Sequence, residues 1–600
     1  MNLALWTVTF LLQLPAVPAS PRTGTASVEG MIVRLGTNEP ISGVDLELTE
    51  VSAATFAQAV PSGSAGSTPP AAPFSAKSNN DGRFAIRNLP SGTYKLVAAR
   101  IGGQFVPFEY GQRGILGRGL NFPLGEGQQM RDVRLEMATV GTITGRVVDE
   151  NGRAVGHAAV LALSPMYRED QLVMNILELV HTDDRGEYRL FSLVPGKYYI
   201  AARPEDPNRR SAVLSMAPPG RRGPSEQATS PVVTKRILPT GETLEETYSF
   251  VYYGGTTDLK RATPLNVMPG NTLGAIDIPI HVGRTTALHI RGKVLDGTTG
   301  KPAAGANVRL IPRVFNTHMI VPSTVTDANG LFDVTGVVPG AYNLYFLGAQ
   351  VPQRPSAPGV PPPPPPVPLM TMTPVDVGNE NVENITVTIA PGSTLTGQIF
   401  VEGQGSASGA LRVSLTFEPV PTGVAMVSTQ STTSAQDGKF RMENLWPASY
   451  RIRLAGIPPN TYVKSVRLGR LDLLNQPFSV PVQQEGPIEI VLGSDHGVVE
   501  GRVVNERQDP AVNVRVALVP DAPLRSRGDL YKSTTTDITG AYRIPLVPPG
   551  DYKIFAWEET EDGAWRDSEF LRSDEARGKS LRLGALRTES ATLTVIPARR

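Results

Sequence analysis

One phrase recurs five times in this chain and sets what it can fold into. It reads "TDDRGEYRLFSLVPGKYYIA" at residues 182–201 and "TDANGLFDVTGVVPGAYNLYF" at residues 326–346, and related versions begin at residues 78, 434 and 536. Ten positions separate the first glycine from the second turn residue in every copy: Gly82 and Gly92, Gly186 and Gly196, Gly330 and Gly340, Gly438 and Ala448, and Gly540 and Gly550. A constant number of residues of varying type between two turns indicates that the backbone geometry requires this spacing.

The two fixed positions of the phrase have the chemistry of turns. In three copies an aspartate stands three residues before the first glycine, where its carboxylate can hydrogen-bond its own backbone in an Asx turn, and the glycine can take the positive φ that closes a hairpin. These pairs are Asp183 with Gly186, Asp327 with Gly330, and Asp537 with Gly540. After the next strand, a Pro-Gly pair predicts a type II turn that needs φ > 0 at the glycine. The second glycines are Gly196, Gly340 and Gly550.

The residues after the second turn alternate between the two faces of a strand. In the second copy Tyr198, Ile200 and Ala202 share one face, and a period of two is typical of a strand that packs on a core. Each copy also has an opening upstream, such as "ITGRVVDENGRAVGHAAVLAL", that reads as strand, polar turn and strand. The pattern predicts an all-β chain in which each copy is an antiparallel sandwich of about seven strands.

The two-part motif "G-x-V-x-D-x-x-G-x-x-V-x-x-A-x-V" and "T-D-x-x-G-x-Y…P-G-x-Y" resembles the carboxypeptidase regulatory-like domain. The resemblance implies Greek-key, transthyretin-like sandwiches of the carbohydrate-binding-like group of folds. It also implies an accessory, non-catalytic role beside peptidases, in bacterial surface proteins or in front of outer-membrane receptors. Two copies depart from the pattern, with Asn79 in the first and Ala435 and Ala448 in the fourth. These losses count against a metal site shared by all the turns.

The length of 600 residues predicts several domains, and the 59 glycines and 54 prolines favour short strands joined by turns. In the second copy "DQLVMNILELV" places Leu172, Ile176 and Leu179 on one helical stripe, which favours a short helix slightly over a strand. The run "GVPPPPPPVPLM" at 359–370 predicts a stiff loop, or alternatively a ligand for a proline-reading partner. The shared openings predict a tandem array of five sandwiches at residues 26–140, 141–285, 286–391, 392–496 and 497–598.

The start of the chain predicts export. An apolar run from Leu3 to Leu14 precedes a "VPA/S" pattern, which favours a signal peptide at residues 1–19 over an uncleaved anchor or a buried strand. No other stretch approaches the roughly 20 apolar residues of a transmembrane helix, so we expect no membrane-spanning segment after cleavage. The expected location is therefore the periplasm, the cell surface or the medium.

Composition and motifs exclude several kinds of chemistry. The chain contains no cysteine, which excludes disulfides and thiolate nucleophiles. Its net charge of +1, without a long basic run, disfavours a nucleic-acid partner. None of the six His begins an HxxE or HExxH motif, and there is no GxSxG, P-loop or GxGxxG. His157 and His181 share the second copy and could meet in space. Surface or turn positions are nevertheless favoured for both over metal ligation. We therefore predict no catalytic residue, no metal ligand and no cofactor.

Aromatic residues in the fifth copy suggest a candidate binding surface. Alternation assigns Tyr552 to the core and leaves Phe555 and Trp557 on the opposite face, and Trp565 follows shortly after. The favoured interpretation is a second small core, formed when Trp565 and Phe570 fold back onto this face. The alternative is a platform on which sugar rings stack. Under that alternative Phe555, Trp557 and Trp565 are the ligand-binding residues.

The sequence thus predicts a non-catalytic, exported, multidomain binding or scaffold protein. Carbohydrate, as a polysaccharide or surface glycan, is the leading ligand class, chiefly because the resemblance implies it. One alternative is a structural or adhesive spacer that binds other surface proteins, and another is an accessory subunit of a peptidase or transporter. Sandwiches joined end to end would favour the spacer.

Overall fold

The computed structural model describes residues 24–598 except 52–72, 101, 113, 116, 118, 169–170, 206–231, 314–321, 350–367, 404–410, 421–429, 482–485 and 523. Its secondary structure is almost entirely β-strand, and the one α-helix among these residues is α1 (Ser568–Arg572). The all-β prediction is therefore confirmed. The predicted signal peptide and most of the proline run lie outside the described residues.

Sandwich 1 has one sheet in the order β4-β1-β8 and a second in the order β3-β2-β5-β6, with β7 also paired to β5. Its strands are β1 (Ala26–Arg34), β2 (Asp45–Glu50), β3 (Phe74–Lys77), β4 (Arg83–Leu89), β5 (Gly92–Ala99), β6 (Phe108–Glu109), β7 (Phe122–Leu124) and β8 (Gln129–Met137).

Sandwich 2 has one sheet in which β9 pairs with β12, β18 and β19, and another in the order β11-β10-β13-β16, with β17 also paired to β13. Its elements are β9 (Gly141–Val148), β10 (Ala158–Arg168), β11 (Gln171–His181), β12 (Glu187–Leu193), β13 (Gly196–Pro204), β16 (Val251–Tyr252), η2 (Leu259–Arg261), β17 (Leu265–Val267), β18 (Thr272–Leu273), β19 (Ile278–Pro279) and η3 (Ile280–Gly283).

A separate three-stranded sheet leads from sandwich 2 to sandwich 3, and we call it the junction sheet. Its order is β14-β15-β20, with β14 (Thr234–Ile237), β15 (Thr243–Tyr248) and β20 (Arg284–Thr286). Sandwich 3 follows as one seven-stranded sheet in the order β23-β22-β25-β26-β27-β21-β24. Its strands are β21 (Leu288–Asp296), β22 (Asn307–Pro312), β23 (Ser323–Val325), β24 (Leu331–Val337), β25 (Gly340–Leu347), β26 (Leu369–Val377) and β27 (Val382–Pro391).

Sandwich 4 has sheets in the orders β31-β28-β36-β33-β34 and β30-β29-β32-β35. Its strands are β28 (Ser393–Val401), β29 (Ser414–Val420), β30 (Gln430–Thr433), β31 (Lys439–Leu445), β32 (Ser449–Ala455), β33 (Tyr462–Leu468), β34 (Leu471–Asp472), β35 (Phe478–Ser479) and β36 (Ile488–Gly493).

Sandwich 5 has sheets in the orders β40-β37-β43 and β39-β38-β41-β42 and carries α1. Its other elements are β37 (Gly497–Val504), β38 (Arg515–Pro520), η4 (Leu524–Ser526), η5 (Gly528–Leu530), β39 (Lys532–Thr535), β40 (Ala541–Val547), β41 (Gly550–Trp557), η6 (Ala564–Arg566), η7 (Glu575–Arg577), β42 (Lys579–Leu583) and β43 (Thr588–Thr594).

The first strand of each sandwich pairs in the same way. It is antiparallel to the strand after the Asp-x-x-Gly hairpin and parallel to a strand near the end of its own sandwich. The pairs are β1 with β4 and β8, β9 with β12 and β18, β21 with β24 and β27, β28 with β31 and β36, and β37 with β40 and β43. A cluster of buried apolar side chains lies within each sandwich. The limits predicted for the sandwiches from sequence stay a prediction.

Residues 171–181 form strand β11, so the predicted helix in this segment is wrong. β11 pairs antiparallel with β10 along almost its whole length, from Arg168 with Gln171 to Ala159 with His181. This cross-strand pairing satisfies the backbone groups that a helix would have paired within itself. Tertiary context therefore outweighs the helical spacing of the apolar residues.

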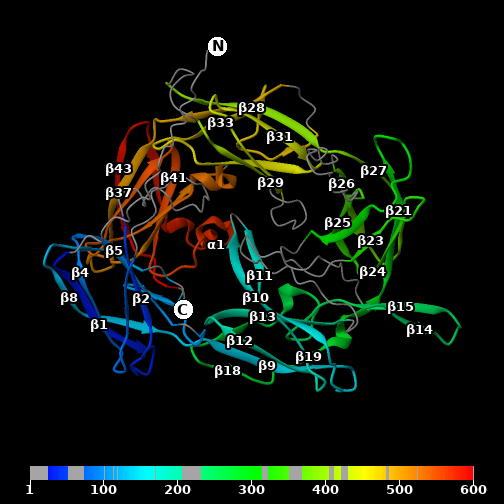
Figure 1. Ribbon diagram of the computed structural model, residues 1–600, viewed down its shortest axis with the longest axis horizontal. Coiled ribbons are helices and arrows are strands. Elements are labelled where there is room, and N and C mark those ends of the chain that lie inside the picture. Colours follow the sequence, from blue (N-terminus) through cyan, green and yellow to red (C-terminus); the bar gives the residue numbers. More distant parts are fainter. Residues whose placement is uncertain are drawn as a thin grey trace, which may run out of the picture.

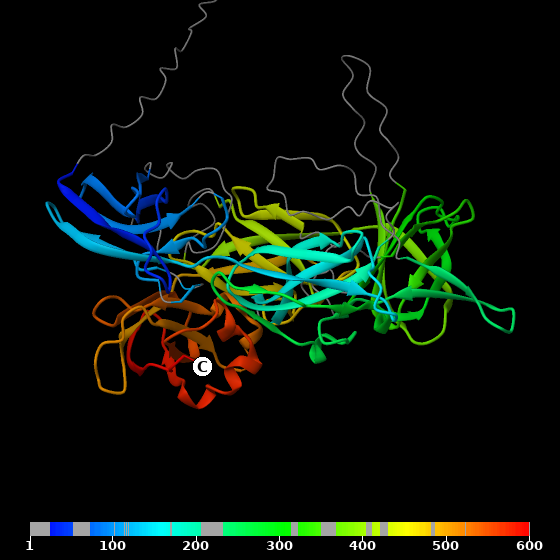
Figure 2. The same cartoon turned by 90° about the horizontal axis from the view of Figure 1, so that it is seen from below.

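The sandwiches follow one another around a ring, from blue through cyan, green and yellow to red (Figure 1). Seen from the side, sandwich 5 lies beneath sandwich 1, so the ring is one turn of a shallow spiral (Figure 2). The Asn513 side chain of sandwich 5 donates a hydrogen bond to the carbonyl of Gly111 in sandwich 1. Tyr167 of β10 packs edge-on against Phe570 of α1, with ring centroids 6.1 Å apart. The last sandwich therefore returns to both of the first two.

Candidate functional site

The first turn of the phrase is held by the side chain that the sequence predicts. In each of three copies the aspartate Oδ1 accepts from the backbone N–H groups two and four residues later, over 2.8–3.0 Å, and the glycine φ lies between +70° and +73°. These turns are Asp183 with Gly186, Asp327 with Gly330, and Asp537 with Gly540. Asn79 makes the same bonds in the first copy. These oxygens therefore serve the turn.

The second glycines do not take a positive φ, so the predicted type II turn is wrong. The left-handed residue instead lies four positions earlier, with φ between +56° and +72°, where the pairing to the first strand slips by one residue. These residues are Asn88, Ser192, Gly336, Asn444 and Leu546. An extra residue in one strand is a β-bulge, which bends that strand. The bulge and the proline thus turn the chain between strands without help from the second glycine.

The tyrosine two residues after the second turn explains the fixed spacing. In every copy its hydroxyl donates to the carbonyl four residues earlier, over 2.7–3.1 Å. The pairs are Tyr94 with Pro90, Tyr198 with Val194, Tyr342 with Val338, Tyr450 with Trp446, and Tyr552 with Pro548. A Cβ at Gly340 would lie 3.2 Å from the Tyr342 ring. At Gly92, Gly340 and Gly550 the missing side chain therefore gives room to the tyrosine that ties the corner.

A buried hydroxyl next to the first turn recurs in all five copies and was missed from sequence. It donates to a carbonyl and accepts from a backbone N–H on the loop before the second strand, over 2.6–3.0 Å. These residues are Ser78, Thr182, Thr326, Ser434 and Thr536, and all are at most 5% exposed. The signal was present, because a serine or threonine stands one position before the Asx site in each copy.

The aromatic residues of sandwich 5 are buried. Phe555, Trp557 and Trp565 are 1%, 2% and 3% exposed, and Phe555 and Trp557 stack with centroids 5.1 Å apart. Phe570 of α1 packs against Trp557, and the indole N–H of Trp557 donates to Asp574 over 2.9 Å. The three residues thus form the second small core of the favoured interpretation. They offer no free face on which a sugar could stack.

An open groove of about 760 Å³ lies on sandwich 2. The guanidinium of Arg146 forms an ion pair with Glu187 at the rim of the groove. The backbone N–H of Arg146 donates to Asp277 Oδ1 over 2.9 Å. His181 contacts Glu205 through Nε2 over 3.0 Å, and this hydrogen bond raises the pKa of His181. The lining residues are Thr144, Gly145, Arg146, Val180, His181, Thr182, Asp183, Glu187, Tyr188, Arg189, Ala275 and Asp277. The groove is thus polar, with both signs of charge, and its volume is in the range of small-molecule sites.

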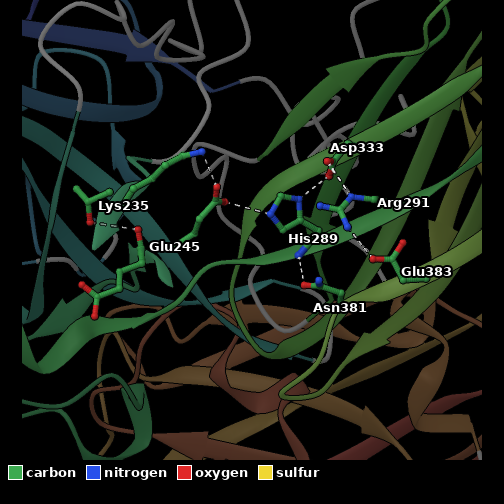
Figure 3. Close-up of polar contacts among 9 residues, drawn as sticks. Lys235, Glu245, His289, Arg291, Asp333, Asn381 and Glu383 are labelled. Atoms are coloured by element: carbon green, nitrogen blue, oxygen red, sulfur yellow. Dashed lines mark hydrogen bonds and ion pairs between the residues drawn. The ribbon is translucent and has the colours of Figure 1, made fainter. Parts of the chain in front are cut away.

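The junction between sandwiches 2 and 3 contains a row of charged side chains (Figure 3). Lys235 and Glu245 come from the junction sheet, whereas His289, Asp333 and the remaining members come from sandwich 3. Lys235 Nζ is 3.0 Å from Glu245 Oε1, and Glu245 Oε2 is 3.1 Å from His289 Nε2. His289 Nδ1 is 2.8 Å from Asp333 Oδ1.

The row continues from Asp333 to a second pair of charges on sandwich 3. Arg291 Nε donates to Asp333 Oδ2 over 2.9 Å, and Arg291 Nη1 donates to Glu383 over 2.8 Å. The hydrogen bond from Lys235 is the main cause that lowers the pKa of Glu245, and His289 adds to it. No sequence signal points to this row, since its members come from five different strands.

Neither a metal centre nor a membrane helix is found in the part of the chain that the structure describes. No three His, Asp or Glu side chains there are arranged to hold a metal ion. No helix in the same residues is long and apolar enough to cross a bilayer.

Comparison with known proteins identifies one domain. Residues 289–364 match the family model of the carboxypeptidase regulatory-like domain, so sandwich 3 contains such a domain. No curated protein matches the chain.

Solved structures with some likeness to the chain include a minor pilin and repeats of a collagen-binding protein. The minor pilin GBS52 of Streptococcus agalactiae is 12% identical with a TM-score of 0.21, and the match covers 43% of this chain and 97% of the pilin. Two B repeat units of the collagen-binding protein of Staphylococcus aureus are 9% identical with a TM-score of 0.14, and the match covers 71% and 94% of the two chains.

Proposed function

We propose that this chain is an exported, non-catalytic scaffold that holds binding surfaces in fixed positions around a ring. The observation that carries the proposal is the return of sandwich 5 to sandwiches 1 and 2 through Asn513 and Phe570. A chain that folds back on itself in this way has its sandwiches held from two sides. An extended spacer, which the sequence left open, would instead have its two ends far apart.

Sandwiches 4 and 5 are also joined by specific contacts, which supports a rigid array. The guanidinium of Arg527 in sandwich 5 donates to Asn475 of sandwich 4 over 3.0 Å and to its own neighbour Asp529. This guanidinium is only 9% exposed. A buried cation that is bonded to both sandwiches resists their separation, because separation would break its bonds.

Carbohydrate is the ligand class that we propose for the scaffold, and the groove of sandwich 2 is the proposed site. The groove combines carboxylates, guanidinium groups and His181, which can bond sugar hydroxyls in both directions. We propose this groove as the sugar site in place of the aromatic residues of sandwich 5, because those residues are buried. A protein ligand on another face and an accessory role beside a peptidase or transporter are the alternatives.

Polysaccharide pull-down with the mature chain tests this proposal. We expect a bound polysaccharide to be lost from the variant Arg146→Ala and kept by Arg502→Ala. Arg502 is the matched control because it is exposed and follows the glycine of the first strand in sandwich 5 as Arg146 does in sandwich 2. Equal loss in both variants would contradict the groove, and hydrolysis of the bound polysaccharide would contradict a non-catalytic role.

A further inference from the structure

His289 lies between two carboxylates that belong to different parts of the ring (Figure 3). Its Nε2 faces Glu245 of the junction sheet and its Nδ1 faces Asp333 of sandwich 3, at 3.1 and 2.8 Å. The imidazole is only 14% exposed. Its backbone N–H donates to the Asn381 side chain over 2.9 Å, which keeps the residue seated on sandwich 3.

The protonation state of the imidazole decides whether both contacts are hydrogen bonds. A neutral imidazole has one N–H donor and one lone pair, whereas the imidazolium has two donors. An ionised carboxylate only accepts. With a neutral ring, either Glu245 or Asp333 would therefore face a lone pair across about 3 Å. Only the imidazolium bonds to both.

The charges around His289 point to the same state. Along the row the side chains are Lys235, Glu245, His289, Asp333, Arg291 and Glu383, from β14, β15, β21, β24, β21 and β27. With a protonated ring, cations and anions alternate and their charges cancel. With a neutral ring, two cations face three carboxylates, and Glu245 and Asp333 repel each other across an uncharged ring.

We infer that His289 is a proton-operated clasp that holds the junction sheet against sandwich 3 when protonated and releases it when neutral. The inference rests on the proposed scaffold, since it makes the stiffness of one joint in the ring depend on pH. The backbone bond from Ala287 to Glu245 O, at 2.8 Å, tethers the sheet in either state. The clasp adds the contact that fixes the angle between the junction sheet and sandwich 3.

The sign of the effect follows from the charges. Both contacts are hydrogen bonds only while the imidazole is charged, so the clasp weakens as the pH rises. The joint is therefore firm in mildly acidic medium and loose in mildly alkaline medium. A ligand bound on sandwich 2 and another on sandwich 3 would be held at a fixed distance only in the acidic condition.

Distance measurements by double electron–electron resonance test the clasp. The chain has Cys 0, so two added cysteines give two labels without removing native thiols. We place them at Thr240, in the turn between β14 and β15, and at Ala328, in an exposed turn of sandwich 3. The expected result is a narrow distance distribution at pH 5.5 that broadens at least twofold at pH 8.5.

Three variants make the test specific. His289→Gln removes the charge and should give a broad distribution at both pH values. His289→Lys keeps a positive charge and should give a narrow one at both. His181→Gln is the matched control, because His181 also pairs with a carboxylate, Glu205, but within sandwich 2. This control should respond to pH like the parent chain.

Three outcomes would overturn the clasp: no pH response in the parent, a pH response that persists in His289→Lys, or loss of the response in His181→Gln. Circular dichroism of each variant checks that the sheets are intact. Small-angle X-ray scattering of the same samples separates the two proposals. An open array at every pH would contradict the scaffold, whereas a closed ring with a pH-insensitive distance would contradict only the clasp.

Discussion

The junction between sandwiches 3 and 4 and the junction between sandwiches 2 and 3 are built from different chemistry. At the first, Ile311, Tyr345 and Met370 of sandwich 3 join the apolar core of sandwich 4, and Tyr345 packs edge-on against Trp446 with centroids 6.2 Å apart. At the second, the contact is the row of charges centred on His289. Apolar burial responds little to pH or salt, while charge pairs respond to both. We therefore expect the apolar joint to be stiff and the charged joint to respond to pH and salt.

The largest expected effect is at the apolar junction. The variant Trp446→Ala removes a large side chain that is 8% exposed, and we expect a loss of about 3–5 kcal/mol in the free energy of unfolding. Urea denaturation followed by circular dichroism measures it. Phe400→Ala is the control, because this phenylalanine is 42% exposed in the same sandwich. A loss below about 1 kcal/mol would mean that the two sandwiches do not share a core.

The next effect lies inside a sandwich and should leave both junctions unchanged. The variant Thr326→Val removes the hydroxyl that bonds Ala303 O and Ala306 N, and we expect a loss of about 1–3 kcal/mol because both groups stay buried. Thr388→Val, at an exposed position on β27, is the control. Denaturation measures the loss, and the Thr240–Ala328 distance should not change. A changed distance would mean that turn and junction are coupled.

A smaller effect is expected at the charged junction. The variant Glu245→Gln removes one anion from the row, and we expect a loss of about 0.5–1 kcal/mol at pH 6 that shrinks in 0.5 M salt. Glu242→Gln, on the exposed turn of the same hairpin, is the control. Denaturation at low and high salt measures both. An effect that does not depend on salt would place packing, and not charge, at this junction.

The smallest effect is expected in acid. The pKa of Glu245 is lowered by Lys235 and His289, so its contribution is present above the ordinary glutamate pKa of about 4.3 and is lost as the pH falls through the lower folded value. As the pH falls below the ordinary glutamate pKa, the Thr240–Ala328 distribution should therefore broaden. Labels at Ala328 and Arg470, across the apolar junction, should show no such change. Broadening at both junctions would indicate general acid unfolding.

The sequence predicts the repeated parts of the molecule well because their causes are local. Asp183 and Gly186 lie within four residues of the groups they serve, so composition and spacing reveal the turn. The buried Thr182 could have been predicted from the same phrase. The bulge at Leu546 could not, since its positive φ follows from pairing with the first strand of the sandwich rather than from the residue type.

The candidate sites could not be predicted in the same way, because their partners are distant in sequence. Alternation correctly predicted that Trp557 lies off the main core. Only the packing of α1 against this residue shows that its indole is covered. His289 and each of its carboxylates are 44 residues apart, and Asn513 and Gly111 are 402 residues apart. Such contacts depend on how the sandwiches are placed around the ring.

Small-angle X-ray scattering of residues 20–600 tests ring closure most directly. Five sandwiches of roughly 100 residues each have radii of gyration of about 13 Å, so a closed ring should give about 30–35 Å and an end-to-end array about 50 Å. The closed ring predicts the smaller value. A value near 50 Å would contradict the ring, and with it the scaffold that holds surfaces in fixed positions.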